Sequence, residues 1–147
     1  MSLRRYMLDT NIVSDLMRNP QGRVFDQIVR VGSNRMCVSI ITAAELRYGC
    51  AKKGSPRLLA RVEAILGSID VLPVNIPSDA EYGGIRAELE AAGKTIGPND
   101  LLIAAHAYAI GATLVTDNLD EFSRVRGLTV ENWLTNEPEN TPEITVR

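Results

Sequence analysis

The sequence predicts an α/β domain of three layers, an α/β/α sandwich in which helices cover both faces of a mainly parallel central sheet. Short apolar segments alternate with segments whose apolar residues recur at helical spacing, which is typical of parallel sheets with crossover helices. Residues 98–110 are apolar on nearly every side of a helix, and such a helix is expected to be buried against the sheet. A chain of 147 residues can bury a core of this kind as one domain.

The first half of the chain contains six predicted elements. The apolar pattern predicts strands over 5–8 and 38–41 and helices over 12–17, 24–31, 43–51 and 56–66. Asn19-Pro20 is expected to end the first helix, because proline disrupts helical hydrogen bonding. Gly54-Ser55-Pro56 is typical of a helix start, with the serine as N-cap and the proline in the first turn, and Gly67 is expected to end that helix.

The second half is predicted to continue the alternation. The pattern predicts strands over 71–74, 111–116 and 128–130, helices over 78–92 and 98–110, and a short helix that ends near Phe122. Ser78 is the expected N-cap of its helix, and Gly93 is expected to follow its end. We assign residues 1–134 to one domain, and we expect residues 135–147, which are polar and interrupted by proline, to form a flexible tail.

Composition restricts the possible partners and the compartment. The net charge of −2 gives the whole chain no long-range attraction for nucleic acid, so any such contact must be local. The basic residues that are candidates to flank a site are Arg47, Lys52, Lys53, Arg86 and Lys94. Without an apolar signal segment after Met1, and with two cysteines that have neither disulfide-framework nor zinc-site spacing, we expect a cytoplasmic protein without membrane attachment.

Four acidic residues adjoin the predicted strand ends and helix starts: Asp9, Glu45, Asp100 and Asp117. Because the carboxyl ends of parallel strands meet at one edge of a sheet, we expect these carboxylates to converge there. Each also has a structural interpretation. Asp9 has the position of a helix N-cap, Glu45 has the capping-box spacing from Thr42, Asp100 suits a helix dipole, and Asp117 suits a turn.

Asp100 favours the functional interpretation. It lies beside an apolar helix that is expected to be buried, where an unpaired charge is costly. Bringing Asp9 close to it would raise the pKa of one carboxyl sharply unless a cation lay between them. Oxygen ligands with open water positions suit Mg²⁺ or Mn²⁺, and such ions typically act on phosphates. The residues therefore predict metal-dependent phosphoryl chemistry.

Other phosphate-handling sites lack their motifs in this chain. No Gly-x-Gly-x-x-Gly follows Leu8, and no glycine-rich loop ends in Gly-Lys-Ser or Gly-Lys-Thr. Asp9-Thr10-Asn11 lacks the second aspartate expected of an aspartyl-phosphate phosphatase. His106, the only histidine, lies on the apolar helix and is expected to be a structural residue rather than a general base.

These motifs together resemble a known family, the PIN domain, and within it the VapC-type toxins of bacterial VapBC toxin–antitoxin modules. The matching segments are 7–11, 39–49, 96–100 with 103–107, and 115–118 with Glu121 and Phe122. They extend over nearly the whole chain, and their order and spacing make the resemblance specific. It implies a PIN-like α/β/α sandwich with an acidic pocket for Mg²⁺ or Mn²⁺, and endoribonuclease activity.

The resemblance also assigns roles to residues. Asp9, Glu45 and Asp100 match the three steadier acidic positions of the family and are the expected catalytic carboxylates, with Asp9 and Asp100 as metal ligands. The candidates for the fourth position of the pocket are Asp117, Asn118 and Glu121. The implied reaction is attack of water on an RNA phosphodiester in a single-stranded loop, with one carboxylate accepting a proton.

The resemblance further implies a substrate and partners. The segments 97–100 and 103–107 look like those of the VapC subgroup that cuts initiator tRNA in its anticodon loop. The implied partners are a cognate VapB-type antitoxin, whose tail covers the pocket, and a second copy of the chain in a homodimer. The hydroxyls of Thr10 and Ser39 are candidates to contact the metal ligands or the phosphate.

Two other functions remain open from the sequence. One is a metal-dependent DNA nuclease, although the chain looks too short to carry an additional DNA-binding arch. The other is a non-catalytic PIN-like interaction module, in which the acidic residues are only helix caps. A receiver-type phosphoacceptor is less consistent, because the expected lysine after the last strands is not evident.

Overall fold

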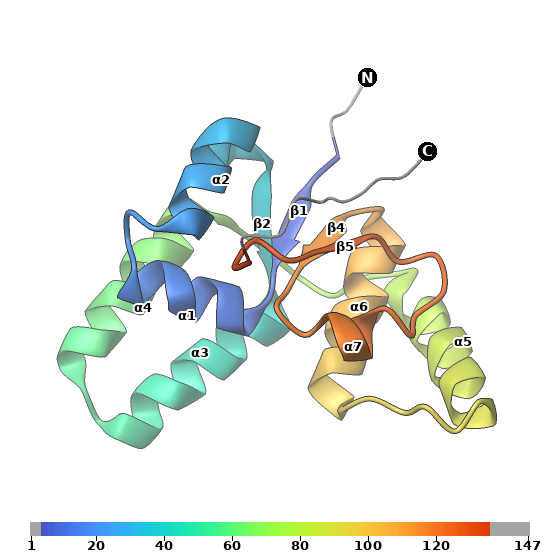
Figure 1. Cartoon of the computed structure of the whole chain (residues 1–147). Coiled ribbons are helices and arrows are strands. Elements are labelled where there is room, and N and C mark those ends of the chain that lie inside the picture. The colour runs from blue at the N-terminus through green and yellow to red at the C-terminus, as the bar shows by residue number, and fades with distance from the viewer. Residues whose placement is uncertain (1–3, 136–147) are drawn as a thin grey trace.

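A parallel five-stranded sheet lies between two layers of helices in the computed structural model, which describes residues 4–135 (Figure 1). The strand order is β3-β2-β1-β4-β5, and every pair of neighbours is parallel. The strands are β1 (Tyr6–Leu8), β2 (Met36–Ser39), β3 (Asp70–Leu72), β4 (Thr113–Val115) and β5 (Val130–Glu131). This arrangement confirms the predicted fold class.

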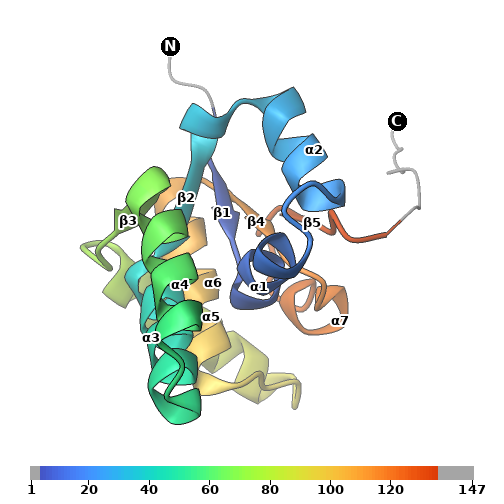
Figure 2. The ribbon, with the colours of Figure 1, turned by 90° about the vertical axis from the view of Figure 1, so that its left-hand side faces the viewer.

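Helices connect the strands and divide between the two faces of the sheet. They are α1 (Thr10–Arg18), α2 (Arg23–Val31), α3 (Ile40–Lys53), α4 (Pro56–Ser68), α5 (Ser78–Ala91), α6 (Pro98–Ile110) and α7 (Leu119–Phe122), with a short 3₁₀ helix, η1 (Ser33–Arg35). In Figure 1, α1 to α4 lie on one side of the sheet and α5 to α7 on the other. Figure 2 views the first layer, with α3 and α4 in front.

Alternation along the strands supplies two separate hydrophobic cores. Leu8 and Val115 pack with residues of α1 to α4, whereas their neighbours Met7 and Leu114 pack with residues of α5, α6 and α7. Successive side chains of a strand point to opposite faces of a sheet, so short central strands serve both cores. The predicted burial of α6 is confirmed, since most of its residues from 101 to 107 are fully buried.

The order of the strands places a ligand site at one edge. The connections β1–β2–β3 run through α1 to α4, and the later connections run through α5 to α7 on the opposite face. The direction of winding therefore changes between β1 and β4. In open α/β sheets, ligands bind outside the carboxyl ends of the strands at such a switch point.

Several predicted boundaries differ from the structure. The N-cap of α3 is Ser39, whose hydroxyl accepts from the Ile41 amide at 3.1 Å. The alternative structural interpretation of Glu45, as part of a capping box with Thr42, does not hold, because the helix begins at Ile40. Ser78 is the first residue of α5 and not its cap, and Gly67 lies inside α4. Ser55 and Pro56 start α4 as predicted. The tail predicted from residue 135 lies outside the described residues after Thr135.

Candidate active site

A cavity of about 640 Å³ that is lined mainly by acidic and other polar residues opens at the carboxyl ends of β1 and β4. Its walls come from the start of α1, the first half of α3, the first turn of α6 and the residue before α7. Asp9, Glu45, Asp100 and Asn118 are among the residues that line it. The fold thus brings together three of the four acidic residues that were expected to converge, and one candidate for the fourth position.

Asp9 is the most buried of the three carboxylates that line the cavity. It is 5% exposed and is the N-cap of α1. Its Oδ1 accepts from the Thr10 amide at 2.8 Å, and its Oδ2 accepts from the Thr116 hydroxyl at 2.8 Å. Burial raises the pKa of Asp9, these two hydrogen bonds oppose that rise, and the nearby charges of Glu45 and Asp117 add to it.

Thr116 was not identified from the sequence, although it positions Asp9. Its hydroxyl also accepts from the Asn118 amide at 3.0 Å, so one fully buried side chain connects β4 to two residues of the cavity. A threonine directly after a buried strand is a common pattern in itself. Only the pairing of β1 with β4, which places Thr116 beside Asp9, gives it this role.

We predict that Thr116→Val destabilises the protein by about 1–3 kcal/mol at pH 8, because the buried Oδ2 of Asp9 loses its donor while the side-chain volume is kept. Urea unfolding monitored by circular dichroism measures this change. Thr42→Val is the matched control, since Thr42 is as fully buried as Thr116 and its hydroxyl has no hydrogen-bond partner among the described residues. Equal losses of stability in the two variants would contradict the role of Thr116.

Glu45 lies one and a half turns into α3 and faces the start of α1. The hydroxyl of Thr10 donates to its Oε1, and the side-chain amide of Asn99 donates to its Oε2 at 3.1 Å. Thr10 therefore supports a carboxylate of the cavity, in line with the sequence expectation. Asn99 was not singled out from the sequence, and its neighbour Asp100 was the only indication of its position.

Asp100 lies in the first turn of α6 and is only partly exposed. Burial and the charge of Asp9, together with contact with Glu121 and the charge of Glu45, raise the pKa of Asp100 to about 7. Glu121 Oε1 is itself buried and has no hydrogen-bond partner among the described residues. Two acidic side chains, Asp100 of α6 and Glu121 of α7, are therefore in contact, and of the two only Asp100 lines the cavity.

The three candidates for the fourth position have different surroundings. Asn118 lines the cavity directly, and Glu121 contacts Asp100 from α7. Asp117 is exposed and accepts from the side chain of Asn11 at 3.2 Å. The structure thus brings Asn118 and Glu121 to the other acidic residues and leaves Asp117 at the rim.

Two polar residues lie away from the cavity wall. His106 is 1% exposed, and its Nδ1 lies 2.8 Å from the hydroxyl of Ser39, which is also fully buried. Burial lowers the pKa of His106, so the imidazole is neutral at physiological pH. The expectation that His106 is buried and hydrogen-bonded is confirmed, and Ser39 joins the start of α3 to α6 at this point.

Two of the five predicted flanking basic residues, Arg47 and Arg86, are paired with glutamates outside the acidic cavity. Arg47 pairs with Glu63 at 2.6 Å, and Arg86 pairs with Glu90 at 2.9 Å. Lys52 Nζ lies 6.0 Å from the ring centre of Tyr48, which lines the cavity. Lys52 is thus connected to the cavity through a cation–π contact.

The donor set of the cavity fits a hard divalent cation. All charged groups in it are carboxylates, the pKa values of Asp9 and Asp100 are both raised, and Glu121 has an unpaired buried oxygen. Within residues 4–135 no three or more acidic, histidine or cysteine side chains lie close enough together to form a cage that could hold a metal ion. Mg²⁺ does not need such a cage, because it keeps several waters and binds through one or two carboxylates. Asp9 and Asp100 are the residues that would hold it.

Comparisons with known proteins agree on one family. The model of the PIN domain matches residues 6–128. The chain is 44% identical over 133 residues to Ribonuclease VapC2 of Haemophilus influenzae. The aligned region covers 88% of this chain and 98% of that protein. It is 40% identical over 130 residues to the tRNA(fMet)-specific endonuclease VapC of Shigella flexneri, with the same shares covered. The chain belongs to the VapC family of PIN-domain ribonucleases.

Structural comparison supports the same family for this VapC-type chain. The crystal structure of DNA-bound VapBC from Salmonella typhimurium matches it with a TM-score of 0.82 at 37% identity, covering 89% of this chain and 99% of that one. The family resemblance drawn from the short motifs is therefore confirmed. The roles of the individual acidic residues, the metal and the domain boundary at residue 134 stay predictions. Residues 4–135 of this VapC-type chain include no helix with the length and hydropathy of a membrane span.

Proposed function

We propose that this chain is a Mg²⁺- or Mn²⁺-dependent endoribonuclease, the toxin of a type II toxin–antitoxin module. The observation that carries the proposal is the meeting of Asp9 and Asp100 in one polar cavity, where the pKa values of both carboxyls are raised. Two partly desolvated carboxylates repel each other, and a divalent cation removes that repulsion. The membership in a family of ribonucleases supports the same assignment.

The proposed reaction is hydrolysis of an RNA phosphodiester. When bound, the metal ion would supply a positive charge that stabilises the phosphoryl oxygens as negative charge develops. Asp9, fixed by its two hydrogen bonds, and Asp100 are the residues that would hold the ion. Glu45 lines the same cavity and is the carboxylate left to accept the proton of the attacking water. The water oxygen bonds to phosphorus, the bond from phosphorus to one ribose oxygen breaks, and that oxygen leaves as a hydroxyl after taking a proton from solvent.

The proposed substrate is a tRNA, with the anticodon loop of initiator tRNA as the favoured site. The name of the Shigella flexneri relative, a tRNA(fMet)-specific endonuclease, supports this substrate. Single-stranded loops suit an open cavity, because their bases and phosphates are accessible without melting a helix. The free, buried Cys37 and Cys50 are consistent with a reducing cytoplasm as the place of action.

The proposed partner is a VapB-type antitoxin, since the solved relatives from Salmonella typhimurium and Rickettsia felis are VapBC complexes. We also propose that the chain forms a homodimer, as the family resemblance implies. The antitoxin has to be removed before activity is measured, because a bound antitoxin tail over the cavity would block the substrate.

We predict discrete cleavage of bacterial tRNA by the antitoxin-free protein in Mg²⁺ or Mn²⁺, with the new ends in one or a few loops. EDTA should abolish the cuts, and excess Mn²⁺ should restore them, because the carboxylates alone cannot stabilise the developing charge. Mapping of the RNA ends by primer extension measures this result.

A DNA oligonucleotide with the sequence of the cut loop is the matched control. It is expected to remain intact, which separates the proposed function from a DNA nuclease. Cuts that persist in EDTA would contradict the metal requirement. A protein that cuts neither nucleic acid while it binds its antitoxin would favour the non-catalytic interaction module instead.

A further inference from the structure

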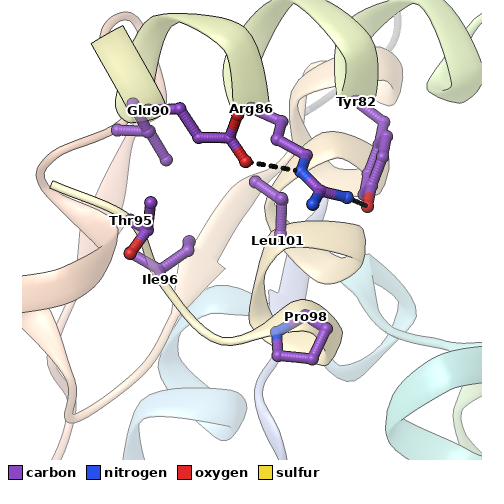
Figure 3. Close-up of a pocket in the computed structure, with 8 residues that line it drawn as sticks. Tyr82, Arg86, Glu90, Thr95, Ile96, Pro98 and Leu101 are labelled. Carbon is purple, nitrogen blue, oxygen red and sulfur yellow. Dashed lines mark hydrogen bonds and ion pairs between the residues drawn. The ribbon is translucent and has the colours of Figure 1, made fainter. Parts of the chain in front are cut away.

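A second cavity lies beside the acidic one, between α5, the segment 93–97 and the first turn of α6 (Figure 3). Its volume is about 350 Å³, within the range of roughly 300–1,000 Å³ that is typical of small-molecule sites. Apolar side chains form much of its wall: Leu89, Ile96, Pro98 and Leu101. We call this cavity the α5–α6 pocket.

The aromatic ring of Tyr82 and the planar guanidinium of Arg86 also line the α5–α6 pocket. The Arg86 side chain extends from α5 between Glu90 and Tyr82, opposite Leu101 of α6 (Figure 3). Its Nε donates to Glu90 Oε2 at 2.9 Å, and its Nη1 donates to the Tyr82 hydroxyl at 2.9 Å. Within residues 4–135 Arg86 makes no other hydrogen bond, and its side chain is 55% exposed. The guanidinium is therefore held in place while part of it stays accessible.

This composition matches the way proteins bind unpaired nucleobases. Bases of single-stranded RNA stack on aromatic rings and on the planes of arginine guanidinium groups, and their edges accept hydrogen bonds from arginine. Tyr82 and Arg86 supply these two surfaces, and the apolar residues supply a floor. Since the net charge of the chain is −2, stacking is a source of RNA affinity that needs no long-range attraction.

The position of the α5–α6 pocket relative to the acidic cavity fits one continuous strand. Pro98 and Leu101 line the α5–α6 pocket, and Asn99 and Asp100 line the acidic cavity. The two cavities therefore share the first turn of α6 as a common wall. Residues three apart share a helix face, whereas the residues between them project to another side. At about 1.5 Å rise per residue, Pro98 and Asp100 are separated by only about 3 Å along the helix axis.

We propose that the α5–α6 pocket binds one unpaired base of the RNA strand whose phosphate lies in the acidic cavity. This proposal rests on the proposed ribonuclease function and adds a determinant of substrate choice to it. Tyr82 and Arg86 hold the base, and the first turn of α6 separates the base from the reacting phosphate. The pocket selects RNA in which a base near the cut site is free to leave its stack.

The test is steady-state cleavage of a synthetic anticodon stem–loop of initiator tRNA in Mn²⁺. Tyr82→Leu and Arg86→Gln are expected to raise KM about five- to tenfold with little change in kcat, because one stacking contact is lost. Tyr82→Phe keeps the ring but loses the hydrogen bond from Arg86, so its KM should lie between those of the wild type and Tyr82→Leu. Arg126→Gln is the matched control, since Arg126 is also exposed and paired with a glutamate, Glu88 at 2.8 Å.

Stem–loops with a single abasic nucleotide locate the bound base. For the wild type, an abasic nucleotide at one loop position should raise KM by the same factor as the Tyr82→Leu substitution does on the intact loop. For Tyr82→Leu, the abasic nucleotide at that position should cause no further rise in KM. Independent effects at every position would overturn the proposal, as would equal KM changes in Arg86→Gln and Arg126→Gln. A wild-type protein that neither binds nor cuts this RNA would overturn the ribonuclease function itself, whereas normal cleavage by both pocket variants would overturn only the base pocket.

Discussion

Asp100→Asn is expected to reduce RNA cleavage by at least about 100-fold and, at the same time, to stabilise the metal-free protein. The loss of activity follows from the loss of a carboxylate that would hold the ion. The gain in stability follows from the cost of an ionised Asp100, because burial and the charge of Asp9 raise the pKa of Asp100 to about 7.

The sign of the stability effect depends on pH. The native state of Asp100 holds its proton more tightly than the unfolded state, whose pKa is near the ordinary 3.8. The penalty is therefore complete above about pH 7 and disappears as the pH falls from about 7 towards 4. The difference between these pKa values corresponds to about 4 kcal/mol, which solvent screening of this partly exposed group reduces to about 1–2 kcal/mol.

Urea unfolding at pH 8 in EDTA measures the stability, and cleavage of tRNA in Mn²⁺ measures the activity. Asp79→Asn is the matched control, because Asp79 is an exposed aspartate in the first turn of α5. It should retain activity and lose a few tenths of a kcal/mol through the helix dipole. If Asp100→Asn behaved like Asp79→Asn in both measurements, Asp100 would be a helix-terminal residue without a functional role.

Divalent metal is expected to bind at least about tenfold more tightly at pH 8 than at pH 6. A proton on Asp100 competes with the ion, and with a pKa of about 7 the ionised fraction rises from about one tenth at pH 6 to about nine tenths at pH 8. The pKa of Asp9 is also raised, so its proton adds to the effect in the same direction.

Calorimetric titration of the antitoxin-free protein with Mn²⁺ at the two pH values measures the affinity. The number of protons released on binding, obtained in buffers of different ionisation enthalpy, should be greater at pH 6 than at pH 8. Asp100→Asn should bind more weakly at both values and lose most of the pH dependence. The same affinity at pH 6 and pH 8 in the wild type would contradict competition between the metal and the Asp100 proton.

Strand ends and helix starts made the acidic cavity predictable from the sequence. The rule that parallel strands end at the same edge predicted that Asp9 and Asp100 would converge, and they line one cavity. Element boundaries were less accurate. β2 leads into α3 at Ser39 without a loop, and an apolar run that continues from strand to helix gives no local sign of the change.

The remaining features of the cavity depend on contacts between distant segments. Thr116 meets Asp9 only because β1 and β4 pair, which no local pattern encodes. Glu121 faces Asp100 because the fully buried Phe122 anchors the four-residue helix α7 in the core. A helix this short has no usable periodicity, so the choice among the candidates for the fourth position could not be made from the sequence.

The division of the hydrophobic core into two clusters has a mechanical consequence for the acidic cavity. Asp9 and Glu45 belong to the half built on α1 and α3, whereas Asp100 and Glu121 belong to the half built on α6 and α7. The hydrogen bond from Asn99 to Glu45 joins the two halves at the mouth of the cavity. An ion held by Asp9 and Asp100 would connect the two halves of the structure through one carboxylate from each. Binding of the metal is therefore expected to stabilise the folded protein as well as to support cleavage.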